Sequence, residues 1–149
     1  MLRETGMSPQ QLTVEITESY AMQNVDYAIG ILKMLKEMGL KVALDDFGIG
    51  YSSLSYLKRF PIDMLKIDRT FVKGVPEARE DTAIIAAIIA LAHSMGMKVI
   101  AEGVEDKKQL LFLHSLGCDE IQGFYFSRPQ PAAKIQKLLE KGARLPGYV

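Results

Sequence analysis

Several acidic residues of this sequence stand at the ends of short apolar segments, where carboxylates can do chemistry. The segment LKVALDDF carries Asp45 and Asp46 near its end, and three further acids lie near the ends of similar segments or follow them: Glu15, Glu102 and Glu105. Like charges brought close together raise one another's pKa, and a hard divalent cation would relieve that repulsion. Carboxylates with few His or Cys residues nearby suit Mg²⁺ or Mn²⁺ and argue against zinc. Together these acids indicate a divalent-metal site, whereas any one of them alone fits a solvated loop carboxylate or a helix N-cap.

Asp45 and Asp46 are adjacent, and adjacent residues of a strand point to opposite faces of the sheet. Both can reach one site only where the regular strand ends. We expect Gly48 to supply that break, because glycine adopts backbone conformations that other residues avoid.

Lys66 is the basic residue that best fits the same site. It lies between Leu65 and Ile67, so its ammonium group is expected to join the carboxylates at the strand ends. One interpretation is a structural ion pair, with Asp63 and Asp68 as further partners. The functional interpretation is a positive group that orients a nucleophilic water or stabilises charge developing on a phosphate.

The sequence predicts an alternation of helices and strands. Apolar residues recur at helical spacing before Gly39, Gly96 and Gly117, and glycine at such places is typical of a helix C-terminus. The predicted strands cover residues 12–17, 40–47, 63–68, 97–104 and 121–126. The predicted helices include residues 53–60, residues 82–95 with Asp81 as N-cap and a largely buried surface, and residues 132–142.

Two of these units are similar in sequence. MGLKVALDD and MGMKVIAEG match in order, which places Asp45 opposite Glu102. A third unit is shifted by one residue, so Gln122 only roughly occupies the place of the acid. Alternation of this kind predicts parallel strands joined by right-handed crossovers.

Two α/β folds fit this pattern, a doubly wound sheet and a TIM-barrel-like (β/α) fold. Polar residues lie near the C-terminal ends of five predicted strands: Glu15, Asp45, Lys66, Glu102 and Gln122. A barrel gathers residues from many strands at this end, whereas an open sheet binds at one switch point. The pattern favours the barrel, although 149 residues are fewer than the about 250 of a typical closed barrel. We therefore expect a single incomplete barrel domain of about five βα units over residues 1–149.

The composition excludes several classes of protein. The chain carries 18 Lys and Arg against 18 Asp and Glu, so no basic excess indicates binding to a nucleic-acid polymer or to a membrane surface. No apolar run approaches the roughly 20 residues that cross a bilayer, and a cytoplasmic chain is expected. Cys118 is the only cysteine, which favours a small buried residue over a reactive thiol. His93 and His114 lie in predicted helices without the spacing of metal ligands.

Two short motifs suggest other functions, but the chain lacks the partners that those functions need. DFG at residues 46–48 occurs in protein kinases, yet neither a glycine-rich loop over a strand nor an HRD motif is present. GIG at residues 48–50 lacks the third glycine of a dinucleotide-binding fingerprint.

Four blocks, VEITES, LDDFGIGYSSLSYLKRFPIDMLKID, VIAEGVE and QGFYFSRP, closely resemble the consecutive signature blocks of EAL domains, the phosphodiesterases of cyclic di-GMP signalling. The resemblance runs from residue 12 to the end of the last helix and implies a modified TIM barrel. It also implies two-metal hydrolysis of cyclic di-GMP to the linear dinucleotide pGpG, with Mg²⁺ or Mn²⁺ as the ions.

Carried over position by position, the resemblance assigns a role to each polar residue. The implied metal ligands are Glu15, Asp45, Asp46 and Glu102, and the implied catalytic residues are Lys66, Glu102, Glu105 and Gln122. Lys66 would contact the catalytic water, while Glu105 and Gln122 would hold the network of water and metal. Glu18 would anchor the loop at residues 47–53, which in the family couples substrate binding and dimerisation to metal binding. The resemblance further implies a homodimer through EAL domains, and sensory or diguanylate cyclase domains upstream.

Two segments of the family are absent. The family is named after a Glu-Ala-Leu motif on its first strand, which supplies a metal-binding glutamate and is followed by an arginine that contacts substrate phosphate. A later strand supplies a metal-binding asparagine. Neither segment precedes residue 12, so the chain resembles roughly the last three fifths of such a domain.

Two alternatives to catalysis follow from these observations. One is a receptor that binds cyclic di-GMP without cleaving it, against which the retained acids argue. The other is an inert or interacting fragment, because an incomplete barrel exposes strand edges that invite pairing with another chain. We expect the parent domain to be catalytic and the isolated chain to be inactive.

Overall fold

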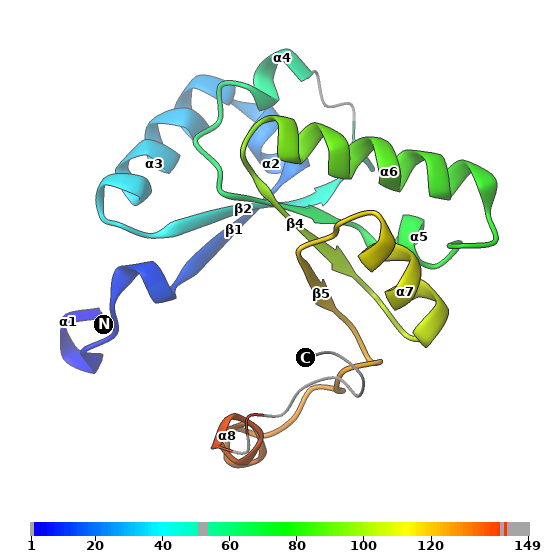
Figure 1. Cartoon of the computed structure of the whole chain (residues 1–149). Helices are drawn as coiled ribbons and strands as arrows, with labels where there is room; N and C mark the ends of the chain where they lie inside the picture. The colour runs from blue at the N-terminus through cyan, green and yellow to red at the C-terminus, as the bar shows by residue number, and fades with distance from the viewer. Residues whose placement is uncertain (1, 51–53, 141, 143–149) are drawn as a thin grey trace.

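Five parallel strands form one sheet in the computed structural model, which describes residues 2–50, 54–140 and 142 (Figure 1). The strands are β1 (Thr13–Thr17), β2 (Lys41–Phe47), β3 (Met64–Ile67), β4 (Lys98–Glu102) and β5 (Glu120–Gln122). They lie side by side in the order β1-β2-β3-β4-β5, and every neighbouring pair is parallel. A doubly wound sheet reverses its order at a switch point, and the described strands show no reversal. The strand order therefore confirms the barrel-like (β/α) winding predicted from the sequence.

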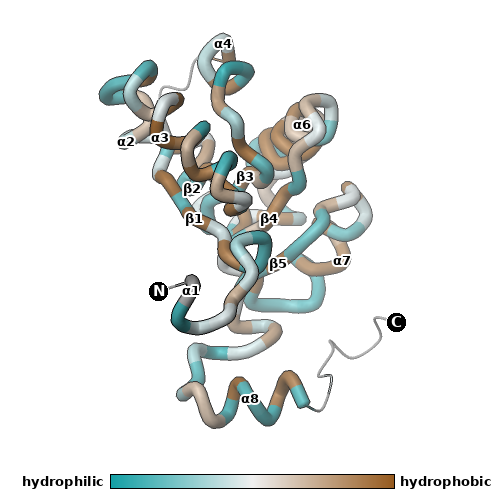
Figure 2. Tube along the Cα trace, turned by 90° about the vertical axis from the view of Figure 1, so that its left-hand side faces the viewer, coloured by the Kyte–Doolittle hydropathy of each residue, from teal (hydrophilic) through white to brown (hydrophobic). Residues whose placement is uncertain are grey.

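Helices connect the successive strands. The helical segments are α1 (Leu2–Thr5), the 3₁₀ turn η1 (Pro9–Gln11), α2 (Glu18–Gln23), α3 (Val25–Glu37), α4 (Leu54–Leu57), α5 (Arg69–Val72), α6 (Arg79–Ser94), α7 (Lys107–Ser115) and α8 (Ala132–Glu140). Figure 1 shows α3 and α6 on the same side of the sheet, as expected when right-handed crossovers join neighbouring strands in order. In Figures 1 and 2, α8 lies apart from the sheet. Within the described residues, no helix is long and apolar enough to cross a membrane.

The core lies between the sheet and helices α3 and α6. Val42, Leu65 and Val99 from three strands are fully buried, and they belong to one cluster with Leu32 of α3 and Ile85 of α6. Burying one such side chain contributes about 1.5–3 kcal/mol relative to leaving it exposed. This cluster keeps the strands aligned, so that their C-terminal ends meet at one edge of the sheet.

The start of α6 differs from the prediction. The helix begins at Arg79 with Ala78 as N-cap, so Asp81 lies in the first turn and is not the cap. Thr82 N–H donates to Ala78 O, which adds residues to the helix before the predicted start. Although Figure 2 shows α6 as a mostly hydrophobic helix, Ile84 is exposed, so the helix is buried on one face only.

The last strand is shorter than predicted. The sequence predicts the strand over residues 121–126, but β5 covers Glu120–Gln122 and ends there. Val104 N–H donates to Gln122 O, and Tyr125 N–H donates to Val104 O. A Cβ atom at Gly123 would lie 2.1 Å from Val104 O, so only glycine allows this approach. The chain turns against Val104 and leaves the sheet.

Two further predicted helices are partly confirmed. The helix expected at residues 53–60 corresponds to α4, which ends at Leu57, and residue 53 lies outside the described residues. The helix expected at residues 132–142 corresponds to α8, which ends at Glu140, and residue 141 lies outside the described part of the chain.

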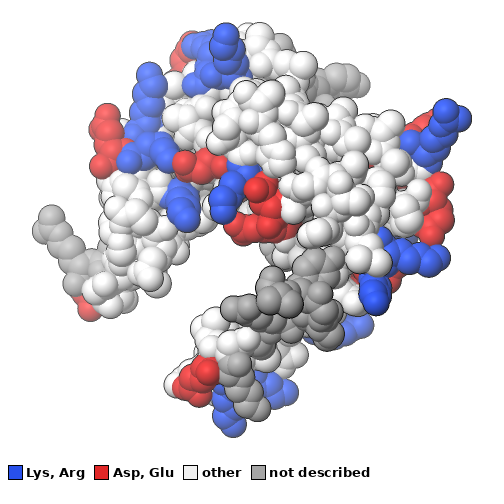
Figure 3. All heavy atoms as spheres, in the orientation of Figure 1, with Lys and Arg blue, Asp and Glu red and all other residues white. Residues whose placement is uncertain are grey.

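Charged groups of both signs are mixed on the surface. Figure 3 shows Lys and Arg side chains beside Asp and Glu on the visible face of the described residues, with large uncharged areas between them. This agrees with the balanced charge of the sequence, 18 basic against 18 acidic residues.

Asp63 joins the N-terminal ends of β2 and β3. Its carboxylate accepts a hydrogen bond from Val42 N–H at 2.8 Å and pairs with Lys36 at the end of α3. Lys36 lies three residues before Gly39, which has φ +84° and ends the helix segment. One side chain thus connects a helix to two neighbouring strands.

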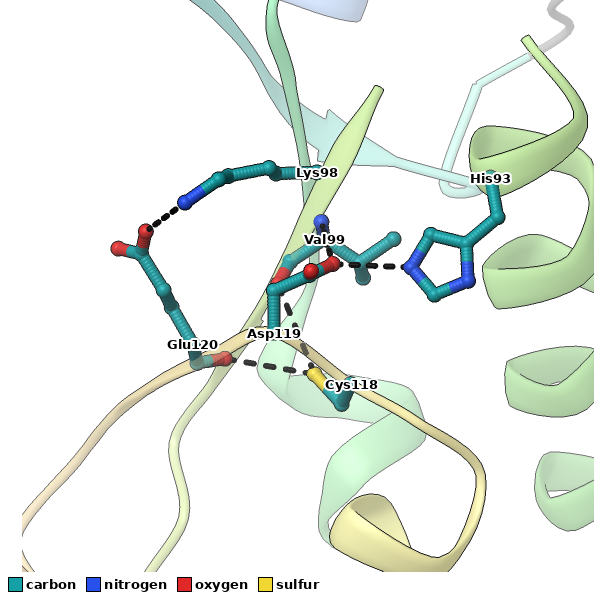
Figure 4. A network of polar contacts seen from close by, with 6 residues as sticks. All are labelled: His93, Lys98, Val99, Cys118, Asp119 and Glu120. Carbon is teal, nitrogen blue, oxygen red and sulfur yellow. Dashed lines mark hydrogen bonds and ion pairs between the residues drawn. The ribbon is translucent and has the colours of Figure 1, made fainter. Parts of the chain in front are cut away.

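Asp119 repeats this contact before β5 (Figure 4). Its carboxylate accepts a hydrogen bond from Val99 N–H at 2.8 Å and lies 2.9 Å from His93 Nε2. His93 lies three residues before Gly96, as Lys36 does before Gly39. Burial alone would raise the pKa of Asp119, but the hydrogen bonds from His93 and Val99 outweigh burial and lower it below its ordinary value.

Cys118 is a half-buried thiol beside this contact. Figure 4 shows its sulfur directed at the backbone of β4 and β5, with Glu120 O at 3.3 Å. Burial raises the pKa of the Cys118 thiol to about 11. The thiol therefore stays protonated at neutral pH, as the sequence-based interpretation of an unreactive cysteine requires.

We predict that Asp119→Asn lowers the free energy of unfolding by about 1 kcal/mol at pH 7, because an amide loses the charge-assisted part of both hydrogen bonds. The pKa of Asp119 is lowered in the folded state, so its contribution is complete above the unfolded pKa of about 4 and disappears as the pH falls through the folded value. Urea unfolding of both proteins between pH 7 and pH 3 measures the difference.

The matched control is Glu120→Gln, because Glu120 lies 3.5 Å from Lys98 in an exposed ion pair. Such pairs contribute little to stability. A loss for Asp119→Asn that stays the same at every pH would contradict the assignment of the effect to the ionised carboxylate.

Candidate active site

The centre of the candidate site is Lys66 in the middle of the sheet. Lys66 belongs to β3 and is only 3% exposed. Its Nζ atom lies 2.6 Å from Glu102 Oε1, 2.7 Å from Glu15 Oε2 and 3.1 Å from Asp45 Oδ1. The three acids come from β4, β1 and β2, so four strands meet at one ammonium group. The expectation that Lys66 joins carboxylates of different strands is confirmed.

The electrostatic balance of this cluster is negative. Burial alone would lower the pKa of Lys66, but its hydrogen bonds to Glu102, Glu15 and Asp45 outweigh burial and raise the pKa well above its ordinary value. The ammonium therefore stays charged at physiological pH. Three carboxylates against one ammonium leave two negative charges in the cluster, which one additional divalent cation would balance.

Asp46 lies beside the cluster in an unusual backbone conformation. Its φ is +56°, a left-handed value that residues other than glycine rarely adopt. The pairing of β2 with β3 is irregular between Leu44 and Phe47, and Asp46 N–H donates to Asp45 Oδ1 at 3.0 Å. The regular pairing of β2 with β3 is interrupted at Asp46, and the strand then continues to Phe47. The expectation that Gly48 supplies the break is therefore wrong. The carboxylate of Asp45 stabilises the strained turn.

The charge around Asp46 shows how crowded this edge of the sheet is. Burial, then the charges of Asp45 and Asp68, raise the pKa of Asp46 above its ordinary value. A positive ion placed among these carboxylates would lower that pKa again.

Two aspartates expected near Lys66 have other partners. Asp63 lies at the N-terminal end of β3 and binds Val42 N–H and Lys36, as described above. Asp68 follows β3 and caps α5, where its Oδ1 accepts a hydrogen bond from Thr70 N–H at 2.7 Å. Both are structural contacts.

A cavity of about 500 Å³ adjoins the cluster at Glu102. Its polar wall contains Glu102, Glu105 and Gln122, and Gln122 is the register partner of Glu102 across β4 and β5. The structure thus brings together three of the predicted residues at one cavity. Although the sequence repeat is shifted by one residue, Gln122 lies directly beside Glu102.

Sequence reasoning missed several residues of this cavity. Arg69, Phe124 and Arg128 line it, and the Arg128 guanidinium lies 4.5 Å from the centre of the Phe124 ring. Arg69 packs against Gly103, where a Cβ atom would lie 2.6 Å from Arg69 Cβ. The aromatic residues Phe124 and Phe126 could have indicated the cavity, but the sequence predicts a strand over residues 121–126.

Glu18 holds the turn that follows Asp46. The side chain is 2% exposed, and its Oε2 accepts a hydrogen bond from Gly48 N–H at 2.9 Å. Within the described residues its Oε1 has no hydrogen-bond partner, and a Cβ atom at Gly50 would lie 2.4 Å from this oxygen. The loop expected at residues 47–53 is therefore in contact with Glu18 over its first half, and residues 51–53 lie outside the described part.

The donor atoms of the cluster fit a hard divalent cation. Three carboxylate oxygens from different strands already surround one positive charge at 2.6–3.1 Å, and that charge is the ammonium of Lys66. Oxygen donors of this kind suit Mg²⁺ or Mn²⁺. Within the described residues, no group of three or more His, Cys, Asp or Glu side chains is arranged around a free metal position. The acids face Lys66 instead.

Known proteins with similar sequence and structure share this arrangement of strands and helices. The cyclic di-GMP phosphodiesterase NbdA of Pseudomonas aeruginosa is 45% identical over 138 residues, which are 93% of this chain and 18% of NbdA. The EAL domain of Mycobacterium smegmatis DcpA superposes with a TM-score of 0.90 at 43% identity, over 97% of this chain and 65% of that one. Klebsiella pneumoniae BlrP1, in a complex with manganese and cyclic di-GMP, superposes with a TM-score of 0.80 at 39% identity, over 86% of this chain and 33% of BlrP1.

The chain thus spans about a fifth of the length of NbdA, one of the curated relatives that it matches. The sequence model of the EAL domain matches residues 1–129, which include Lys66 and every acid of the cluster. This chain belongs to the EAL domain family.

Proposed function

We propose that residues 1–149 form one partial EAL domain of a cyclic di-GMP phosphodiesterase, which hydrolyses one phosphodiester bond of cyclic di-GMP to give linear pGpG. The observation that supports this proposal most strongly is the convergence of Glu15, Asp45 and Glu102 on Lys66 at the C-terminal ends of parallel strands. Barrel enzymes place their active sites at this end of the strands. NbdA, the similar protein of Pseudomonas aeruginosa, is a cyclic di-GMP phosphodiesterase.

In this proposal two ions, Mg²⁺ or Mn²⁺, are held by acids of this chain together with ligands outside it. The ligands from this chain are Glu15, Asp45, Asp46 and Glu102. When bound, the ions would supply the positive charge that stabilises the entering and leaving oxygens of the phosphodiester. The manganese complex of BlrP1 with cyclic di-GMP supports this choice of cofactor.

Lys66, Glu105 and Gln122 would position the attacking water. The Lys66 ammonium lies among the acids, and an N–H released from one of them would donate a hydrogen bond to the oxygen of that water. Glu105 and Gln122 line the cavity beside Glu102, where an ionised carboxylate accepts hydrogen bonds and a side-chain amide both donates and accepts them. Glu105 and Gln122 would thus act on the side of the cluster that faces the cavity.

The cavity has the chemistry to hold part of a cyclic dinucleotide. Phe124 offers an aromatic face on which a purine base can stack. The guanidinium groups of Arg69 and Arg128 line the same wall and suit phosphate oxygens, with which arginine forms strong paired hydrogen bonds. Substrate would thus lie between the metal ligands and the aromatic wall.

The receptor alternative has less support. A domain that only binds cyclic di-GMP has no need of an acid cluster at 2.6–3.1 Å around one lysine. We further propose that the parent protein dimerises through its EAL domains. We also propose that it carries sensory or diguanylate cyclase domains, a proposal that the coverage of only 18% of NbdA supports.

The chain alone should cleave cyclic di-GMP very weakly or not at all. In the described sheet, β1 and β5 each pair with one neighbour only, so the strand carrying the Glu-Ala-Leu ligand has its place beside an open edge. We predict activity on the order of a hundredfold or more lower than that of a longer chain that includes this strand. Chromatographic measurement of pGpG compares the two chains, and equal turnover would show that the additional ligands are dispensable.

In the longer chain, Asp45→Asn should lower Mn²⁺-dependent cleavage by about a thousandfold, because an amide is a weak ligand and adds no negative charge. The fold should persist, since Asn keeps the shape of the side chain. The control is Asp26→Asn, because Asp26 forms an exposed pair with Arg59 away from the cluster. Unchanged cleavage by a folded Asp45→Asn protein would remove Asp45 from the site.

Glu18 should act through the loop that it holds. In the longer chain, we predict that Gly50→Ala lowers cleavage about tenfold, because the added Cβ meets Glu18 Oε1 at 2.4 Å and must displace the loop or the acid. Gly30→Ala is the matched control, because nothing lies within 4 Å of the added atom. Equal activity of both variants would show that the contact between Glu18 and the loop has no role in catalysis.

A further inference from the structure

The ammonium of Lys66 uses all of its hydrogen-bonding capacity on acids. An ammonium has three N–H donors and no acceptor. Glu102, Glu15 and Asp45 each lie within 3.1 Å of Lys66 Nζ, which accounts for all three donors. In this state Lys66 has no donor left for a water molecule or a phosphate oxygen.

The stem of Lys66 keeps the ammonium at this place. Leu65 and Ile67 on either side are fully buried, and β3 pairs with β2 and β4. The backbone therefore cannot move away, and only rotation of the side chain can change the partners of Nζ. The acids for their part surround Lys66, and the described residues contain no ready-made group of three metal-binding side chains.

We propose that Lys66 is the resident cation of the metal-free site, and that a divalent ion displaces its ammonium from the carboxylates and so frees it to bind the attacking water or a phosphate oxygen. The proposal rests on the metal site of the proposed function and adds a second state to it. Lys66 holds Glu15, Asp45 and Glu102 together before the ion arrives. It also competes with the ion for the same oxygens.

The first test measures Mn²⁺ binding by calorimetry to the 149-residue chain and its Lys66→Met variant. Without the competing ammonium, the variant should bind Mn²⁺ on the order of tenfold more tightly, because like charges repel strongly at a few ångströms. Its metal-free form should melt at a lower temperature, and Mn²⁺ should raise its melting temperature by more than that of the original chain. Lys36→Met is the matched control, because Lys36 pairs with Asp63 at the opposite end of the strands, and its Mn²⁺ affinity should not change.

The second test needs no substitution, so it still tests the displacement of the Lys66 ammonium if Lys66→Met does not fold. Nitrogen NMR of the chain with labelled lysines follows the Lys66 ammonium signal while Mg²⁺ is added. The signal should shift as the three carboxylates leave the ammonium. An unchanged signal at saturating Mg²⁺, or a folded Lys66→Met variant that binds Mn²⁺ no more tightly, would overturn the proposal.

The outcomes separate this inference from the proposed function. Cleavage of cyclic di-GMP by the longer chain together with an unchanged Lys66 signal would overturn the inference alone. If neither the 149-residue chain nor its Lys66→Met variant binds Mn²⁺, the inference is wrong. If the longer chain also does not cleave cyclic di-GMP, the proposed function is wrong as well.

Discussion

A buried lysine sets the condition on which the rest of this site depends. Removing an ammonium group from water costs several kcal/mol unless charged partners surround it, and Lys66 lies buried in the central strand β3. Its partners are Glu15 of β1, Asp45 of β2 and Glu102 of β4. These acids can reach one atom only because β2 and β4 flank β3 and all the strands run parallel. Strand order and charge therefore support each other, since another order would leave buried charges unpaired.

The backbone beside this cluster is irregular at Asp46. Asp46 continues the chain from Asp45, and a regular strand would direct it to the opposite face of the sheet. Its φ of +56° turns the chain at this point, at a cost of about 1–3 kcal/mol that the surrounding contacts must offset. Buried Phe47 holds the strand beyond the turn, and Glu18 binds Gly48 N–H. The strain is thus fixed between two contacts and lies beside the acids that converge on Lys66.

The sequence allowed prediction of the residues whose position depends on strand order alone. Lys66 and the acids of β1, β2 and β4 lie in the middle or the C-terminal part of their strands, and parallel strands in this order bring such positions together. Other contacts between residues that are far apart in the sequence could not be predicted from strand order. Asp63 is only three residues from Lys66, yet about 10 Å along a strand separates them, so it binds Val42 N–H instead. The early end of β5 depends on the backbone of Val104, which lies 18 residues before Gln122 in the sequence.

In the repeated strand–helix unit, the contacts that stabilise the fold and the acids that bind Lys66 lie at opposite ends of the strands. At the N-terminal ends, Asp63 and Asp119 bind a backbone N–H and a helix side chain, and these contacts hold neighbouring elements together. At the C-terminal end of the sheet, the corresponding acids of the two similar units, Asp45 and Glu102, both bind Lys66. The two ends of each strand are joined only through the buried core. The polar residue at the C-terminal end of a strand can therefore change while the aspartate contact at the N-terminal end is kept. Gln122 is such a change, for it pairs in register with Glu102 and offers a donor and an acceptor without adding charge to an edge already crowded with carboxylates.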